Sequence, residues 1–242
     1  MWLWVLAFTL LAFTLLPILI NRTKPGLKNL LKDRREALVV FAHPDDETMF
    51  FLPMISLLNG LGFPLRFLCL STGDFDGLGE TRVKEFRAVC RYLNAASCEI
   101  VHDEKLRDGP HMWEAGDVSR VVSGYLMKYP RLDTIFTFDG YGVSGHPNHI
   151  SVFEGIRSLR TKKDDLLKLY LVSVPLWRKY LLVFDMLLVY IFTGAEALIA
   201  VNWQDPLKSS RVMQLYASQN VWFRKLFSIF SRYSYVNEFV RM

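Results

Sequence analysis

The sequence predicts an α/β fold, a Rossmann-like parallel sheet with helices on both faces, preceded by an N-terminal transmembrane helix. From residue 38 onward, short apolar segments alternate with longer segments of helical periodicity, and this alternation is typical of a parallel sheet with crossover helices. Glycine, proline or acidic residues follow several of the apolar segments, where strands are expected to end. Residues 2–20 contain no charged side chain, which predicts the membrane segment.

The N-terminal apolar segment predicts a membrane anchor. At ~1.5 Å per residue, residues 2–20 just span a hydrocarbon core of about 30 Å. The segment has no basic residues before it and no small-residue cleavage site after it, so a signal peptide is not indicated. Basic residues follow it directly, and the positive-inside rule therefore places the remainder in the cytosol. We expect an anchor over 1–20, a basic linker over 21–36 and one α/β domain over 37–242.

The charge distribution indicates a partner surface. The net charge is +5, and basic residues gather in the linker. Their position after an apolar segment favours an anionic membrane over nucleic acid, and we expect no nucleic-acid partner. Cys69, Cys90 and Cys98 form no C-x-x-C motif, which predicts three unpaired core cysteines in a reducing compartment.

Apolar runs bounded by turn residues predict the strands, and helical periodicity predicts the helices. The expected strands are 38–42, 65–71, 98–101, 132–138 and 169–174, the last clear strand. The expected helices are 48–61, 80–94, 117–129 and 149–159.

The sequence does not decide whether two C-terminal segments contact the membrane or pack on the domain. Residues 180–201 are apolar but contain Asp185 and Glu196, so an interfacial or core helix pair is favoured over a second membrane span. Residues 220–235 carry aromatic residues at helical spacing beside basic residues. This segment fits either an aromatic helix lying in a membrane interface or a terminal helix packed on the domain.

A polar cluster follows the strand expected at 38–42. His43 and Pro44 come next, and then three consecutive acidic residues, 45–47. Pro44 has no N–H and ends the strand, and open α/β sheets bind ligands at the carboxyl ends of strands. Three adjacent acids repel one another, and a cation would relieve this repulsion. Helix capping is the alternative, but capping accounts for one or two of the acids and not for His43.

A second cluster follows the strand expected at 132–138. A glycine-rich loop leads to His146 and His149, whose spacing of three places both rings on one side of a helix. Together with His43 and Asp46, these histidines predict a metal site formed by two strand ends.

Two histidines and a carboxylate are a standard Zn²⁺ ligand set with one open position. We assign His43, Asp46 and His149 as ligands, although spacing alone leaves open which three of the four groups bind the metal. Asp45 would be the general base, and His146 would donate to the developing oxyanion and to the leaving nitrogen. These groups suit hydrolysis of an amide or ester, and a phosphoester remains an alternative.

Two motifs carry a resemblance to a known family. The runs Ala-His-Pro-Asp-Asp-Glu at 42–47 and Gly-His-Pro-Asn-His at 145–149 resemble the LmbE-like (PIG-L) family of zinc-dependent de-N-acetylases. Residues 137–146 and 222–233 resemble its eukaryotic branch, the N-acetylglucosaminylphosphatidylinositol de-N-acetylases of glycosylphosphatidylinositol (GPI) anchor synthesis. The resemblance implies a Rossmann-like fold and removal of acetate from N-acetylglucosaminyl-phosphatidylinositol to give glucosaminyl-phosphatidylinositol. It also implies Zn²⁺, with another divalent metal left open, and a single-pass protein on the cytosolic face of the endoplasmic reticulum membrane.

The resemblance matches the site residue by residue. His43, Asp46 and His149 fall on the family's metal ligands, Asp45 on its general base and His146 on its oxyanion-stabilising or acid histidine. Whether a protein partner is needed is left open by the sequence. The alternative function is a non-catalytic, membrane-anchored scaffold or lipid-binding protein of the same fold.

Two further residues are candidates for substrate binding. Arg82 falls where the family has a substrate-contacting arginine, but it could instead be a surface residue paired with Glu80 or Glu85. Asp139 could orient sugar hydroxyls or a ligand histidine, or simply form a turn. Tyr216 departs from the family, since many relatives carry histidine there, which puts in doubt a role of that position in binding the sugar.

Overall fold

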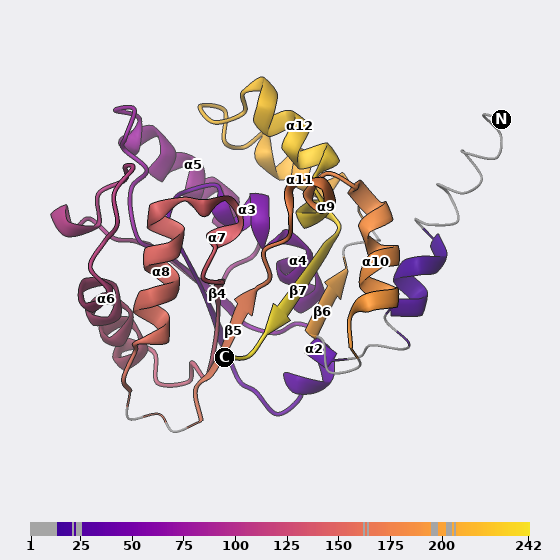
Figure 1. Cartoon of the computed structure of the whole chain (residues 1–242). Coiled ribbons are helices and arrows are strands. Elements are labelled where there is room, and N and C mark those ends of the chain that lie inside the picture. The colour runs from indigo at the N-terminus through magenta and orange to yellow at the C-terminus, as the bar shows by residue number, and fades with distance from the viewer. Residues whose placement is uncertain are drawn as a thin grey trace.

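The fold is built on one seven-stranded sheet in the order β3-β2-β1-β4-β5-β7-β6 (Figure 1). The computed structural model describes residues 14–20, 22, 26–161, 163, 165–194, 198–201, 205 and 207–242. The strands are β1 (Ala37–Phe41), β2 (Leu65–Cys69), β3 (Ser97–Ile100), β4 (Thr134–Phe138), β5 (Leu167–Leu171), β6 (Leu198–Val201) and β7 (Val236–Val240).

The first five strands confirm the predicted parallel sheet. β1 pairs in parallel with β2 on one side and with β4 on the other, and all five of its residues are buried. The chain winds outward from β1 through β2 to β3 and then crosses back to β4. The winding therefore reverses between β1 and β4, the place where open α/β sheets bind ligands.

Helices cover both faces of the sheet, as the sequence predicts. α4 and α5 lie on one face, while α6 and α8 pack on each other over the opposite face (Figure 1). The α-helices are α2 (Gly26–Leu30), α3 (Asp46–Phe50), α4 (Leu52–Gly60), α5 (Gly79–Tyr92), α6 (Ala115–Lys128), α7 (Gly142–Gly145), α8 (Pro147–Arg157), α9 (Leu176–Lys179), α10 (Asp185–Phe192), α11 (Lys208–Met213) and α12 (Trp222–Phe230). The described residues also contain three short 3₁₀ turns: η1 (Glu104–Leu106), η2 (Leu182–Phe184) and η3 (Arg232–Ser234).

The sheet is mixed rather than purely parallel, which corrects the prediction. β7 pairs antiparallel with both β5 and β6. The helix pair expected over 180–201 is also wrong, because α10 is followed by β6. All four residues of β6 are buried, and a short run that is apolar throughout does not distinguish a strand from a helix by its periodicity.

The helix expected over 48–61 is two helices, α3 and α4, separated at Phe51. Pro53 explains the break, since it has no N–H to donate and its ring crowds the preceding turn. The side chain of Asn237 on β7 fills the gap. It donates to the Phe50 carbonyl at 2.8 Å and accepts from the Met54 N–H at 3.0 Å. The break is therefore fixed by a strand that the sequence analysis missed.

The predicted membrane anchor is described only in part. Residues 1–13 lie outside the described residues, and residues 14–20 are helical. In the described part of the chain, no helix combines the length and the apolar character that spanning a bilayer requires. The end of the anchor segment contacts the domain, because Ile20 is buried with Met186, Val189 and Tyr235 in a small apolar cluster beside α10.

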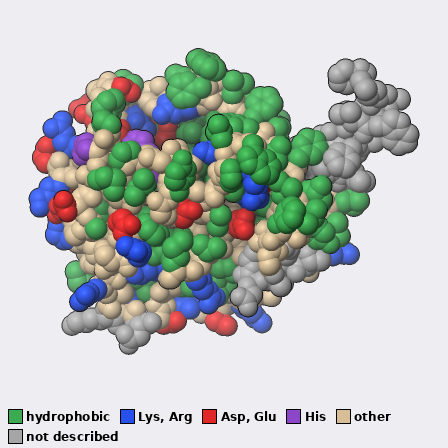
Figure 2. Space-filling view, in the orientation of Figure 1, with side chains coloured by type: hydrophobic (Ala, Val, Ile, Leu, Met, Phe, Trp, Pro, Cys, Tyr) green, Lys and Arg blue, Asp and Glu red, His purple; other side chains and the backbone are tan. Residues whose placement is uncertain are grey.

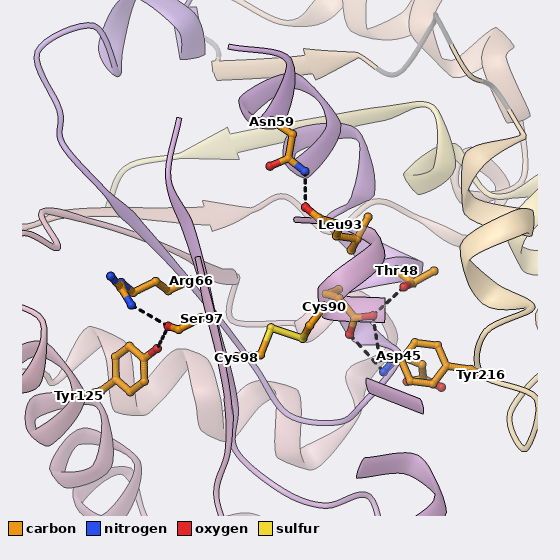
Figure 3. Close-up of a disulfide and its surroundings, with 11 residues drawn as sticks. Asp45, Thr48, Asn59, Arg66, Cys90, Leu93, Ser97, Cys98, Tyr125 and Tyr216 are labelled. Carbon is orange, nitrogen blue, oxygen red and sulfur yellow. Dashed lines mark hydrogen bonds between the residues drawn. A yellow bond between two sulfur atoms is a disulfide. The ribbon is translucent and has the colours of Figure 1, made fainter. Parts of the chain in front are cut away.

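The expectation of three unpaired cysteines is wrong for two of them. Cys90 at the end of α5 and Cys98 on β3 form a disulfide (Figure 3). Cys69 is free and buried, as predicted. Pairs separated by only a few residues can be joined across a helix–strand turn, so the absence of a C-x-x-C motif did not exclude a disulfide here.

Candidate metal centre and active site

His43 and Asp46 occupy the turn that ends β1. The Asp46 carboxylate folds back on the strand end, where its Oδ2 accepts hydrogen bonds from the N–H groups of Ala42 at 3.1 Å and His43 at 2.8 Å. These two bonds hold the other oxygen, Oδ1, toward the histidine loop that follows β4. The predicted pairing of these two strand ends is thus present in the structure.

Asp45 has a left-handed backbone, with φ of 113°. This conformation is costly for a residue with a side chain, and such strain persists where the surrounding structure requires it. Here it turns Asp45 and Asp46 in different directions, although the two residues are adjacent. Capping is therefore an incomplete account of the acidic run, because Asp45 makes no side-chain capping bond to α3.

The second strand end supplies His149 and His146. His149 Nδ1 lies 2.9 Å from the carbonyl oxygen of Gly142, and the ring stacks on Phe138 with centroids 4.2 Å apart. A proton on Nδ1 for this bond leaves the lone pair of Nε2, next to Asp46, free to bind a metal. Gly142 has φ of +61°, and a Cβ there would lie 2.5 Å from the Cβ of His149. Only glycine fits this position without displacing the histidine.

Three side chains meet at the centre of the site, and Asp46 directs a different carboxylate oxygen to each of the two histidines. His149 Nε2 is 3.3 Å from Asp46 Oδ1 and 3.3 Å from His43 Nδ1, and His43 Nδ1 is 3.6 Å from Asp46 Oδ2. Ligands on one tetrahedral Zn²⁺ ion, with bonds of about 2.0–2.1 Å, lie about 3.4 Å apart. The predicted ligand set therefore fits a metal ion with little movement.

A second set overlaps with the first. Donor atoms of His43, His146 and His149 all lie within 4.8 Å of one another. We favour the set that contains Asp46 because its separations are shorter and match one coordination sphere. His146 has a different bond, since its Nδ1 accepts the N–H of Asn148 at 3.2 Å.

Asp108 is a site residue that the sequence analysis missed. Its Oδ1 lies 3.0 Å from His43 Nε2, and the side-chain oxygen of Asn148 lies 2.9 Å from the same nitrogen. A proton on Nε2 satisfies these acceptors and leaves His43 Nδ1 free for a metal, an arrangement common for ligand histidines. Asn148 lies within the Gly-His-Pro-Asn-His motif, so its position was a usable signal. Asp108 lies in an irregular loop with no pattern that could have revealed it.

Asp45 lies between two arginines. Arg82 approaches one of its carboxylate oxygens at 3.5 Å, and Arg224, from α12, approaches the other at 3.3 Å. Burial raises the pKa of Asp45 above its ordinary value, although both arginines oppose the shift. A carboxylate with a raised pKa accepts a proton more readily, as a general base must. Arg224 was noted in the sequence only as a basic residue flanking aromatic ones.

His146 is neutral near pH 7. Burial and the neighbouring His43 and His149 lower its pKa to about 4. Because Nδ1 accepts the N–H of Asn148, the proton of the neutral ring is on Nε2. His146 also lines the cleft that contains Asp45. It can therefore donate one hydrogen bond to a substrate but carries no second proton to transfer.

Arg82 is buried rather than on the surface. Its guanidinium donates to the carbonyl groups of Gly73 at 2.9 Å and Pro44 at 2.7 Å, beside Asp45 and Asp108. The alternative of a surface pair with Glu80 or Glu85 is not what the structure has, since Glu85 accepts from Ser218. Substrate binding by Arg82 stays a prediction.

Asp139 forms the turn that was the alternative to substrate binding. Its carboxylate accepts from the N–H groups of Tyr141 and Gly142 at 3.1 Å and from the N–H and hydroxyl of Ser173 at 2.6 Å. These bonds fix Gly142, whose carbonyl accepts from His149. Asp139 thus supports a predicted metal ligand through the backbone, and a contact with the sugar stays a prediction.

Tyr216 is wholly buried, with its hydroxyl donating to Glu47 at 2.8 Å. Thr48 donates to the same carboxylate oxygen at 2.6 Å, and Figure 3 shows Tyr216 close to Thr48 and Asp45. Burial raises the pKa of Glu47 to about 7. Tyr216 therefore packs beneath the acidic turn and does not line the cleft.

The site opens into a cleft of about 510 Å³. Its walls come from the two strand ends, from the end of α9 and the residue after it, and from α12, which together contribute Lys179, Tyr180, Phe223, Arg224 and Phe227. Lys179 is nearly buried and donates to the Val143 carbonyl at 2.7 Å. The cleft thus combines the candidate metal centre with a cationic and aromatic wall.

Metal analysis of purified variants distinguishes the two ligand sets. We expect Asp46→Ala to lose bound metal, because it removes one of three donors. We expect His146→Ala to retain the metal at the wild-type level, because its ring is outside the closest donor set. The measurement is metal content by elemental analysis after dialysis. Loss of metal in His146→Ala together with retention in Asp46→Ala would show that the three-histidine set is the correct one.

Asp108→Asn tests the contact to His43. Since partners of ligand histidines typically change metal affinity ~10–100-fold, we expect a loss in this range. Asp103→Asn is the matched control, because Asp103 lies in the same loop but pairs with exposed Arg120. Competition with a chromogenic chelator measures both affinities. Equal affinities in the two variants would show that Asp108 does not support the ligand.

Comparison with known proteins shows which family the chain resembles. Residues 38–159 match the family model described as PIG-L: GlcNAc-PI de-N-acetylase. The chain is 33% identical to the N-acetylglucosaminyl-phosphatidylinositol de-N-acetylase of Bos taurus, covering 89% of this chain and 87% of that protein. For the enzyme of the same name from Saccharomyces cerevisiae the identity is 30%, with coverage of 97% and 91%.

A solved structure shows the same fold. The N,N'-diacetylchitobiose deacetylase from Pyrococcus horikoshii superimposes with a TM-score of 0.56 at 17% identity, covering 98% of this chain and 91% of that one. PIG-L deacetylases are metal-dependent, and the histidine group described above could bind a metal. By its family match, and by relatives at 30% identity or more over most of their length, this chain belongs to the PIG-L family of GlcNAc-PI de-N-acetylases.

Proposed function

We propose that the protein hydrolyses the acetamide of N-acetylglucosaminyl-phosphatidylinositol, releasing acetate and glucosaminyl-phosphatidylinositol for GPI-anchor synthesis. The observation that carries the proposal is the meeting of His43, Asp46 and His149, whose donor atoms approach one another at 3.3–3.6 Å beside the buried Asp45. The relatives named for this reaction support the choice of substrate. A non-catalytic scaffold would need neither these donors nor the strained backbone of Asp45.

The residues fit Zn²⁺ as the metal. His43, Asp46 and His149 would hold it, and two imidazoles with one carboxylate are a common catalytic Zn²⁺ set. When bound, such an ion supplies a Lewis acid that polarises the acetamide and makes water acidic enough to attack near neutral pH.

Asp45 is the proposed general base. It takes the proton of the attacking water, and its raised pKa favours this transfer. Arg82 and Arg224 hold the carboxylate from two sides and limit its movement. When the C–N bond breaks, the amine needs a proton, and the protonated Asp45 carries one.

His146 is the proposed oxyanion donor. Its Nε2–H stabilises the negative charge that develops on the acetamide oxygen. The sequence also predicts that His146 protonates the leaving nitrogen, but a ring with a pKa of about 4 has no second proton at neutral pH. We therefore assign that step to Asp45.

We also propose that the domain faces the cytosol at the endoplasmic reticulum membrane, as a single-pass protein. The apolar residues 2–20 and the basic residues that follow them support this orientation. The Cys90–Cys98 disulfide argues against it, because disulfides are rare in the cytosol.

Protease protection in sealed microsomes decides the orientation. A cytosolic domain is digested by added protease without detergent, whereas a luminal marker protein stays intact. If the domain is protected until detergent is added, the proposed orientation is wrong and the disulfide is explained by an oxidising compartment.

Acetate release from N-acetylglucosaminyl-phosphatidylinositol tests the reaction. We expect a zinc chelator to abolish release and added metal to restore it. Asp45→Asn removes the base and should lower kcat by a factor of about 10²–10⁴ while metal stays bound. Asp117→Asn, a remote change of the same kind on α6, is the control. Release that persists in chelator, or full activity in Asp45→Asn, would contradict the proposal.

A further inference from the structure

α12 is apolar on two sides. Its inward side chain, Phe227, contacts the rings of Phe50 at 5.6 Å and Tyr180 at 6.3 Å in the wall of the cleft. Its outward side exposes Trp222 by 73% and Leu226 by 46%. A packed terminal helix, one of the two alternatives for this segment, accounts for the inward side only. Large exposed apolar groups in a row indicate an interaction surface.

Large apolar side chains are also exposed on α9, and Tyr180, which follows α9, contacts Phe227 of α12. Leu176 is 70% exposed and Trp177 is 62% exposed. Figure 2 shows hydrophobic side chains gathered over the part of the molecule where Figure 1 places α9 and α12. We call this surface the apolar rim. It comprises Leu176, Trp177, Trp222, Phe223, Leu226 and Phe230.

The charges around the apolar rim suit an anionic partner. Residues 207–235 contain five basic side chains and no acidic one. Arg211, Arg224 and Arg232 pair with acids outside this segment, whereas Lys225 on α12 is exposed. Between residues 176 and 194 the sequence has one acid, Asp185. That acid is fully buried and paired with Arg178 and Arg232. An apolar row beside exposed positive charge is the pattern of a surface that lies on an anionic bilayer.

The position of the N-terminal segment agrees with this orientation. Ile20, the last residue of the apolar segment, is buried against Met186 and Val189 of α10. α10 follows α9 directly, after the turn η2. An anchor that inserts through residues 2–20 would therefore bring this side of the domain to the bilayer.

The apolar rim also borders the cleft. Phe223 belongs to both, and Arg224, the next residue, reaches the Asp45 carboxylate at 3.3 Å. We propose that α9 and α12 form a docking surface for an anionic phospholipid bilayer, which places the mouth of the cleft at the lipid–water interface. The inference rests on the proposed function for what enters the cleft, namely the sugar head group of a lipid whose chains stay in the membrane.

Fluorescence quenching tests the docking directly. The full chain carries a thiol-reactive fluorophore at Leu226→Cys or Trp177→Cys, in vesicles of phosphatidylcholine and phosphatidylinositol. Cys69 is buried and the other two cysteines are bonded, so the new thiol is the reactive one. Met127→Cys is the matched control, because Met127 is an apolar residue, 78% exposed, on α6.

We expect the fluorophores on α9 and α12 to be quenched by nitroxide-labelled lipids and protected from aqueous iodide, with the reverse at position 127. Iodide quenching at 226 and 177 that equals quenching at 127 would overturn the proposal. Protection from both quenchers would also overturn it, because it would indicate a protein contact instead of lipid.

Kinetics give an independent measurement. The double variant Trp222→Ser, Leu226→Ser should raise KM for substrate in vesicles about tenfold or more, since each side chain loses its burial in lipid. Turnover of soluble N-acetylglucosaminyl-inositol should be unchanged, as with Met127→Ser. Equal effects on both substrates would contradict docking. If the wild-type protein deacetylates neither substrate, the proposed function is wrong. Docking is then decided by the quenching measurement alone.

Lys225→Glu provides a variant that leaves the apolar packing intact. Reversing this one exposed charge should raise KM for substrate in phosphatidylinositol-containing vesicles about tenfold. It should change KM little when the vesicles contain phosphatidylcholine alone. An equal effect with both lipid compositions would show that charge complementarity has no part in docking.

Discussion

The parallel pairing of β1 with β4 is the constraint on which the site depends. It aligns Val39 with Phe136 and so brings together two strand ends that lie about a hundred residues apart in the sequence. Parallel strands present their carboxyl ends at the same edge, and the winding reverses between these two. The sheet register therefore brings His43 and Asp46 to His149, and local features such as Gly142 and the turn at Asp45 orient the side chains.

The adjacent acids Asp45 and Asp46 have opposite surroundings. Asp46 accepts two backbone N–H groups and faces two imidazoles, which hold the pKa of its carboxyl well below the usual range despite burial. Asp45 faces two arginines, and burial raises its pKa. The left-handed backbone at Asp45 separates the two carboxylates. One acid is thereby suited to coordinate a cation and the other to accept a proton.

The predictable part of the site follows from rules that link sequence to strand ends. An apolar run, a proline and a polar cluster located His43 and Asp46, and the histidine spacing located His149. Asp108 and Arg224 reach the same place from a loop and a distant helix, where no periodicity constrains them. Likewise, β6 and β7 pair across more than thirty residues of chain, and only this tertiary pairing distinguishes the four-residue β6 from a helix.

α12 contacts the catalytic site on one side and is exposed on the other. Phe227 rests on Phe50, which in turn contacts the ring of His149 with centroids 5.7 Å apart. Arg224 from the same helix holds Asp45. A shift of α12 would therefore disturb both the ligand and the base. The inward contacts of Phe227 and Arg224 hold the helix against the site, which leaves its outward side available for docking.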